Sequence, residues 1–371
     1  MKMIPKKMKT MHYKLLNTVL LFVLISDLIS GQSFSEKKSF RNSVPANKDL
    51  ALEVNNKYGN IHITSWNTDS VVIRVEIEAF SSNLERLHKM FDGIKVNMSE
   101  TSFLVRAETE FTQNINMLFE EFKGMTNKII PFESRIQVNY SINVPDYLNM
   151  KISNKYGEVY MENSTGTFSL NLSNGSFKAN SLNKIEGINL TFCDATINKM
   201  NGGNIDASFS EVEIGESVDL SIHSVSSRFN LKKTGRLNTE SRRDKFFIGT
   251  VISVMGDSYF TDYRLENLEK EINLLTKYGS LKVDLINKGV ELITINSAYS
   301  DINLIFDPSV SYNLDIKHMN TFLVLPERNA SIEKKILNED KKEYMTFGSV
   351  GRNPGNVKVM IEASRGNIYL K

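Results

Sequence analysis

Polar turns alternate with short strand-like segments over much of this chain. From Lys151 to Leu325 a small or turn-forming residue recurs every 17 to 21 positions, and apolar side chains follow it two and four positions later. The turn positions are Gly157, Gly175, Cys193, Ser210, Ser227, Asp244, Thr261, Gly279, Ser300 and Asn320, and the last is followed by Phe322 and Val324. Alternation with a period of two predicts that one side of each strand is buried.

The regular spacing predicts how these strands are assembled. Each unit has room for two or three short strands joined by Asn, Gly and Ser turns, and it cannot bury its apolar side chains alone. We therefore expect an all-β fold, a single-stranded, right-handed β-solenoid (β-helix) of about ten coils over residues 151–325, with residues 356–371 as a final coil. The alternative is an antiparallel sandwich with evenly spaced strands.

The flanking segments depart from this pattern. Residues 32–150 are expected to form an N-terminal capping region of β-strands that covers the first open strand edge. Within it, apolar residues recur at three- and four-residue steps over residues 82–93, which predicts one short amphipathic helix. Residues 114–125 are a second candidate, either a helix or an excursion. Residues 326–355 are polar and irregular, and we expect a loop excursion there.

The first 31 residues differ in composition from the rest. Five lysines precede or begin an apolar stretch from Leu15 to Ile29, which Asp27 interrupts, and small residues follow. This arrangement is typical of a secretory signal peptide, with a membrane anchor as the alternative. Without this segment the chain has 40 basic and 42 acidic residues. The near-neutral balance argues against a nucleic-acid partner, and no later apolar run is long enough to span a membrane.

The cysteine and histidine content limits which disulfides and metal sites the chain can form. One cysteine, Cys193, excludes a disulfide framework, and the five histidines form no closely spaced pair. We therefore expect no metal site and no cofactor. Motifs for a phosphate-binding loop or a nucleophilic serine elbow are absent from the sequence.

Several segments that share a turn and a strand carry a family resemblance. They are NKYGNIHI at 56–63, NKYGEVYM at 154–161 and GNIYL at 366–370, and a strand beginning at Trp66 follows the first. In their order and spacing they resemble the putative-adhesin family of exported bacterial domains of unknown function. The resemblance covers almost the whole chain after residue 31. It implies a β-solenoid in the periplasm or at the outer-membrane surface of a Gram-negative cell, and it implies no catalytic residues.

Charged residues directly after the turn positions give one candidate catalytic site. Asp194 and Glu211 would fall in register on neighbouring coils, where adjacent strands lie about 4.8 Å apart. Such a pair could serve glycoside hydrolysis, which needs two nearby carboxyl groups. A solvated charge ladder is the alternative, because Arg228 and Lys245 follow in the same column. The compact basic cluster Arg242, Arg243 and Lys245 is either a polyanion site or a solvated edge.

Aromatic residues directly before the turn positions give the main candidate binding surface. They are Tyr58, Tyr156, Phe192, Phe209, Phe260, Tyr278 and Tyr299. In register they would stack along the solenoid. We expect the column to face inward as part of the core; an outward column would instead offer rings to a sugar or a partner surface, with Tyr156, Tyr278 and Tyr299 as its binding residues.

These patterns together favour a non-enzymatic function. We expect an exported, adhesin-like or envelope-associated interaction protein that binds a protein or glycan partner through a repetitive surface. The alternative is a carbohydrate-active β-helix enzyme, such as a polysaccharide lyase or glycosidase. A third hypothesis is a purely structural or assembly role.

Overall fold

The computed structural model describes residues 33–112, 134–327 and 329–371, and in this part of the chain the fold is all-β with one short helix. The strands before the longest one are β1 (Phe34–Pro45), β2 (Ala51–Lys57), β3 (Ile61–Trp66), β4 (Ser70–Ser81), β5 (Ile94–Glu100), β6 (Leu104–Phe111), β7 (Ser134–Pro145) and β8 (Asn149–Lys155), and the helix is α2 (Leu84–Asp92). The others are β9 (Glu158–Ser208), β10 (Glu211–Val225), β11 (Arg228–Arg242), β12 (Lys245–Tyr259), β13 (Asp262–Lys277), β14 (Ser280–Ile286), β15 (Leu292–Ala298), β16 (Asp301–Phe306), β17 (Tyr312–Val324), β18 (Ala330–Asn338), β19 (Glu343–Val350) and β20 (Lys358–Leu370).

The chain divides into two compact units, and the first contains the helix. Of the described residues, this unit comprises 33–38, 77–95, 111–112 and 134–137. Helix α2 begins after Asn83, whose side chain accepts a hydrogen bond from the backbone N–H of Arg86, and its Leu87 and Met90 are buried. The helix predicted over residues 82–93 is therefore confirmed. The predicted signal peptide and the candidate helix at 114–125 lie outside the described residues.

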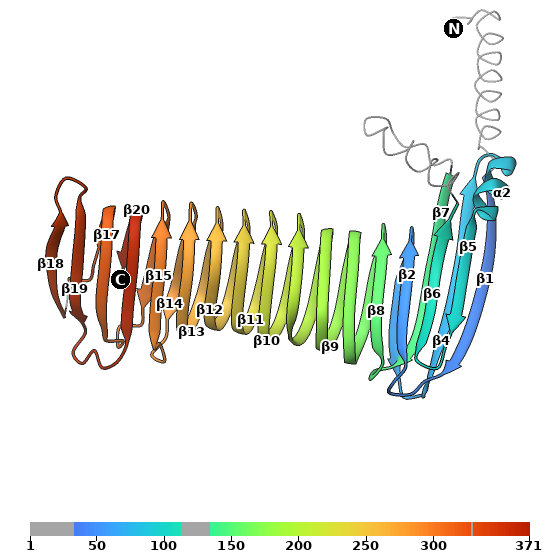
Figure 1. The fold of residues 1–371 in the computed structure, drawn as a ribbon, viewed down its shortest axis with the longest axis horizontal. Helices are drawn as coiled ribbons and strands as arrows, with labels where there is room; N and C mark the ends of the chain where they lie inside the picture. The colour runs from blue at the N-terminus through green and yellow to red at the C-terminus, as the bar shows by residue number, and fades with distance from the viewer. Residues whose placement is uncertain (1–32, 113–133, 328) are drawn as a thin grey trace, which may run out of the picture. The chain divides into compact units, whose positions relative to one another are not determined.

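Parallel strands in register build the second unit, which comprises residues 39–76, 96–110 and 138–371. Strand β10 pairs with β9 and β11, and each of its paired residues lies opposite the residue 17 positions earlier and the residue 17 positions later. The same offset continues from β11 to β12 and, at its start, from β12 to β13. In Figure 1 strands β8 to β13 stand side by side in this order, and β14 and β15 both pair with β13. Consecutive strands are parallel, whereas the sandwich alternative requires antiparallel strands.

The core of the second unit follows the predicted alternation. The side chains two positions after five consecutive turn positions are at most 1% exposed: Val212, Phe229, Phe246, Tyr263 and Leu281. The rings of Phe229, Phe246 and Tyr263 stack on one another with centroids 4.7 and 4.9 Å apart. Identical positions in successive strands bring these rings together, so burial and stacking stabilise the same contacts.

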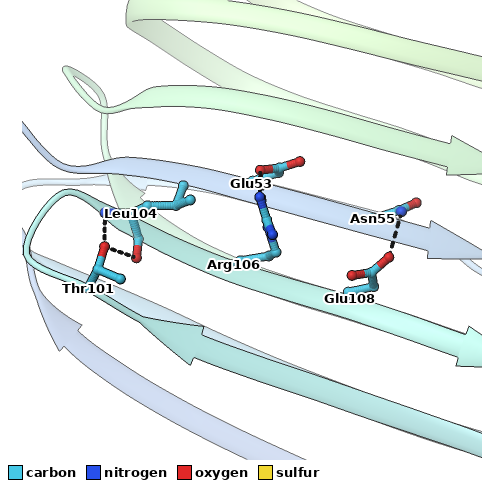
Figure 2. A network of polar contacts seen from close by, with 6 residues as sticks. All are labelled: Glu53, Asn55, Thr101, Leu104, Arg106 and Glu108. Carbon is cyan, nitrogen blue, oxygen red and sulfur yellow. Dashed lines mark hydrogen bonds and ion pairs between the residues drawn. The ribbon is translucent and has the colours of Figure 1, made fainter.

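Cross-strand polar pairs join the first strands of this unit. Strand β2 pairs in parallel with β6 and with β8. The Arg106 guanidinium donates to Glu53 at 2.9 and 3.2 Å, and the Asn55 amide donates to Glu108 at 3.0 Å (Figure 2). At the turn before β6, the Thr101 hydroxyl accepts from the backbone N–H of Leu104 at 3.0 Å. These pairs fix the register between β2 and β6 on their exposed side.

The end of the chain is placed differently from the prediction. Strand β20 does not follow the earlier strands in sequence order but lies between β15 and β17, and it is parallel to both. Residues 326–355 are not an irregular loop, because β18 and β19 form an antiparallel hairpin there, and β19 also pairs with β17. The charged run 339–343 includes the hairpin turn, so its polarity marked a turn between strands.

A one-residue error in the predicted register appears at the last turn position. Asn320 has a φ of +50°, like the residue before each earlier turn position, so it occupies that preceding place. Leu323 therefore lies opposite the buried Ile368, while Phe322 is 60% exposed. Because side chains alternate along a strand, a slip of one residue exchanges the inner and outer faces.

Candidate functional site

A recurring left-handed corner positions the candidate surface. We call corner residues those with positive φ that precede each turn position in the second unit. They are Tyr58, Tyr156, Asn174, Phe192, Phe209, Ser226, Arg243, Phe260, Tyr278, Tyr299, Asn320 and Arg365, with φ between +50° and +63°. A bulky residue rarely takes this conformation, which costs about 1–3 kcal/mol at each position.

The bend itself does not require an aromatic residue. Asn174, Ser226, Arg243 and Asn320 adopt the same conformation as the aromatic corner residues. Asparagine is among the residues that tolerate positive φ best. The aromatic side chains are therefore not explained by the geometry of the corner, and their contribution lies in what the rings contact.

The aromatic corner residues point outward, which corrects the expectation of a buried column. Tyr278 is 47% and Tyr299 is 44% exposed, and Phe192, Phe209 and Phe260 are exposed as well. The physical reason is the bend: it directs the side chain before the turn position away from the core, while the residue at the turn position faces inward. Ser210, Ser227, Asp244, Thr261 and Ser300 are all buried there.

The exposed rings stack in separate groups. Phe260, Tyr278 and Tyr299 form a continuous stack, with centroids 5.0 and 4.9 Å apart and ring planes within 18° of each other. We call these three residues the outer aromatic stack. Phe192 and Phe209 form a second pair at 5.0 Å.

Tyr278 and Tyr299 are thus brought together as predicted, whereas Tyr156 is not part of their stack. Tyr156 stacks on Tyr58 at 5.2 Å, and both are half-buried. Arg365 was not among the predicted site residues, but its guanidinium lies 4.8 Å from the centroid of the Tyr299 ring. Its position before Gly366, in a segment that resembles the other turns, was the available signal. The positively charged Arg365 guanidinium over the Tyr299 ring is a cation–π contact at this end of the outer aromatic stack.

Buried hydroxyl and carboxyl groups hold the backbone beneath the corners. The Ser210 hydroxyl accepts from the backbone N–H of Cys193, and the Ser227 hydroxyl accepts from that of Ser210. Asp244 is 1% exposed and accepts from the N–H of Ser227 at 2.6 Å and from the hydroxyls of Ser224 and Ser241 at 2.7 Å. This ladder satisfies N–H groups that would otherwise be buried without acceptors.

The predicted acidic pair is in register. Asp194 lies opposite Glu211, Glu211 opposite Arg228, and Arg228 opposite Lys245. All four are exposed. They line a depression of about 520 Å³ together with Phe209, Ser226 and Arg243. Arg242 is exposed and does not line it, so only Arg243 and Lys245 of the predicted basic cluster face this depression.

The single cysteine is buried and unpaired. Cys193 is 3% exposed, and its thiol lies 3.3 Å from the carbonyl oxygen of Thr191. Burial raises the pKa of this thiol, so the unreactive protonated form is favoured. Within the described residues, no three His, Cys, Asp or Glu side chains are grouped so as to hold a metal ion. No helix in this part of the chain is long and apolar enough to cross a membrane.

Comparison with known proteins leaves the family open. No family model matches this chain, and no curated protein matches it. Solved structures that resemble it include one described as a putative cell adhesion protein from Clostridium sporogenes, at 11% identity and a TM-score of 0.21, covering 91% of this chain and 99% of that one. A putative adhesin from Parabacteroides merdae is 12% identical with a TM-score of 0.31, covering 72% and 91%.

A third structure is described as a putative lipid binding protein from Parabacteroides distasonis, with 10% identity, a TM-score of 0.32 and coverage of 72% and 92%. These scores are too low to carry an argument.

Proposed function

We propose that this chain is an exported, non-enzymatic interaction protein of the cell envelope, built on a β-solenoid, and that its outer aromatic stack contacts a protein or glycan partner. The parallel pairing at a constant offset of 17 residues supports the solenoid. The observation that carries the binding role is the exposure of Phe260, Tyr278 and Tyr299 at strained corners.

The free-energy cost of placing exposed aromatic residues at positive φ is the reason to assign these rings a function. Exposed rings gain little from burial, and each occupies a backbone conformation that asparagine adopts more easily. Stacking of the rings on one another offsets this backbone strain by only about 0.5–1.5 kcal/mol per contact. Retained strain at exposed positions is typical of binding surfaces. Aromatic side chains are also the residues that contribute most at interfaces.

The environments of Asp194 and Glu211 favour a binding role over a catalytic one. A pair of catalytic carboxyl groups needs two different environments, one of which keeps its acid protonated. Asp194 and Glu211 are both exposed side chains on adjacent strands. Their similar environments support the proposal of a non-enzymatic function.

The binding role is tested with variants that keep the corner conformation. In Tyr278→Asn/Tyr299→Asn both rings are removed, and asparagine retains the tolerance of positive φ that Asn174 and Asn320 show. Binding to isolated cell envelopes is measured by co-sedimentation of the purified protein. We expect a loss of about tenfold or more in affinity, as for central aromatic contacts. The matched control Tyr156→Asn removes a ring outside the outer aromatic stack and keeps binding; equal binding by both variants contradicts the proposal.

Export is tested separately by fractionation of the cells that produce the full chain. We expect the protein in the envelope fraction, shortened near Gly31. Full-length protein in the cytosol contradicts this part of the proposal.

A further inference from the structure

The column of aromatic corner residues is interrupted between Phe209 and Phe260. Phe192 and Phe209 stack on each other, but the next two corner residues are Ser226 and Arg243, after which Phe260 begins the outer aromatic stack. One face of Phe209 is thus covered by Phe192, while on the other side the corner carries only a serine. The depression of about 520 Å³ lies at this gap.

The size of the gap suits one ring. Neighbouring strands are about 4.8 Å apart, so Phe209 and Arg243, two strands apart, are separated by roughly 9.6 Å along the stacking direction. A ring in the place of the missing side chain would lie about 4.8 Å from each neighbour. The stacked corner rings of this chain have centroid separations of 4.9 to 5.2 Å, so such a ring would be spaced like them.

Three cations border the same depression. Arg228, Arg243 and Lys245 are exposed, and within the described residues none of them forms an ion pair. Some cations elsewhere on this unit are paired with acids on nearby strands: Arg236 with Asp219, and Lys178 with Glu158 at 3.0 Å. The depression therefore presents guanidinium and ammonium groups that no carboxylate of the described residues neutralises by direct contact.

Two acceptors complete the lining. The carboxylates of Asp194 and Glu211 lie on the Phe209 side of the depression and form no ion pair in the described part of the chain. Carboxylates only accept hydrogen bonds, so a matching ligand must offer donors on this side and an anion on the other. A polyphosphate has no such donors and would be repelled by both acids. A carboxylated sugar has hydroxyl donors and a carboxylate on one ring.

We propose that this depression is a binding site for an acidic sugar, a uronic-acid unit of a polysaccharide. The apolar face of the pyranose ring stacks on Phe209 above Ser226. Its carboxylate accepts from Arg228, Arg243 and Lys245, and its hydroxyls donate to Glu211 and Asp194. The site goes beyond the proposed function, because it uses neither Tyr278 nor Tyr299.

The test uses tetragalacturonate as the probe, with neutral maltotetraose as the comparison, and isothermal titration calorimetry on the full chain. We expect tetragalacturonate to bind, to weaken as salt rises, and to bind more tightly than maltotetraose. The absence of binding, equal binding of maltotetraose, or tighter binding of ATP, which would indicate a nucleotide site, overturns the proposal.

Two kinds of variant locate the site. Ser226→Tyr fills the gap with a ring and is expected to abolish binding, while Asn174→Tyr adds a ring at an equivalent corner and leaves binding intact. Arg228→Gln removes one charged donor without changing a corner, and a loss of roughly tenfold in affinity is expected. Unchanged affinity in both Ser226→Tyr and Arg228→Gln overturns the assignment.

Two results separate this proposal from the proposed function. Tyr278→Asn/Tyr299→Asn is expected to keep tetragalacturonate binding while it loses binding to envelopes. A loss of tetragalacturonate binding in that variant, with Arg228→Gln unaffected, would place the sugar on the outer aromatic stack and overturn the site at Ser226.

Discussion

The ring of Tyr278 stacks on that of Tyr299 with centroids 4.9 Å apart, although both residues have positive φ and nearly half of each side chain is exposed. The two residues lie 21 positions apart in the sequence. The parallel pairing of β13 with β15 and of β14 with β16 places them at neighbouring corners. This relationship separates two effects of each tyrosine, strain in the backbone and stacking of the ring, which substitutions can measure independently.

Substitution at Tyr278 should show that the strain is real. Tyr278→Ala loses the ring and keeps a residue that disfavours positive φ, whereas Tyr278→Asn loses the ring and relieves part of the strain. We expect Tyr278→Asn to be more stable than Tyr278→Ala by about 0.5–1 kcal/mol. Urea unfolding followed by circular dichroism measures the difference. A Tyr278→Ala protein as stable as Tyr278→Asn would contradict the strain argument.

Neighbouring phenylalanines on β12 should differ strongly in their contribution to stability. Phe246 is 1% exposed and stacks between Phe229 and Tyr263, while Phe247 is 42% exposed. We expect Phe246→Ala to lower the free energy of unfolding by about 3–5 kcal/mol. The matched control Phe247→Ala should change it by less than about 0.5–1 kcal/mol. Similar costs for both substitutions, measured by urea unfolding, would show that the inner and outer faces of β12 are misassigned.

Serine, which occupies the equivalent turn positions 210 and 227, should partly replace Asp244 as a hydrogen-bond acceptor. Asp244→Ala leaves the Ser227 N–H and the hydroxyls of Ser224 and Ser241 without this acceptor, at a cost of about 1–3 kcal/mol. Asp244→Ser introduces the side chain that Ser210 and Ser227 carry in the same place, and we expect it to recover part of this loss. Thermal unfolding measures both variants. An Asp244→Ser protein no more stable than Asp244→Ala is the outcome that speaks against the ladder.

Stability should fall at high pH because of buried tyrosines. Burial raises the pKa of Tyr263 from 10.0 to about 12, and the same cause raises the pKa of Tyr140 to about 12. Since the folded pKa is above the unfolded value, the contribution is fully present below pH 10 and is lost as the pH rises towards 12. The slope is about 1.4 kcal/mol per pH unit for each tyrosine in this range. Tyr263→Phe should flatten the decrease in unfolding free energy, and a slope as steep as in the unsubstituted protein would refute the assignment.

The sequence predicted the buried alternation but not the path of the last strand. Phe229, Phe246 and Tyr263 were identifiable because a fixed period aligns them and apolar side chains repeat two positions after each turn. The insertion of β20 between β15 and β17 was not predictable, because pairing between distant segments leaves no local pattern. The register at Asn320 was missed because asparagine is common both as a turn residue and at positive φ.

The sequence pattern identified the aromatic column that contains Tyr278 and Tyr299, but the column was predicted to face the core and is exposed instead. Tyr278 and Tyr299 repeat with the same period as the core residues, and periodicity alone cannot distinguish an inner column from an outer one. The left-handed corner decides the direction of the side chain, and aromatic residues give no signal for positive φ. Polar residues at equivalent corners, Asn174 and Arg365, were the overlooked signal that the column is exposed.

The proposed function requires that the outer aromatic stack, and not the buried rings, contacts a partner. Tyrosine-selective ¹³C labelling and NMR spectroscopy, with and without solubilised envelope extract, test it most directly. We expect the ring signals of Tyr278 and Tyr299 to shift or broaden on addition of the extract, while those of the buried Tyr140 and Tyr263 stay unchanged. Unperturbed signals from Tyr278 and Tyr299, or changes confined to the buried tyrosines, would contradict it.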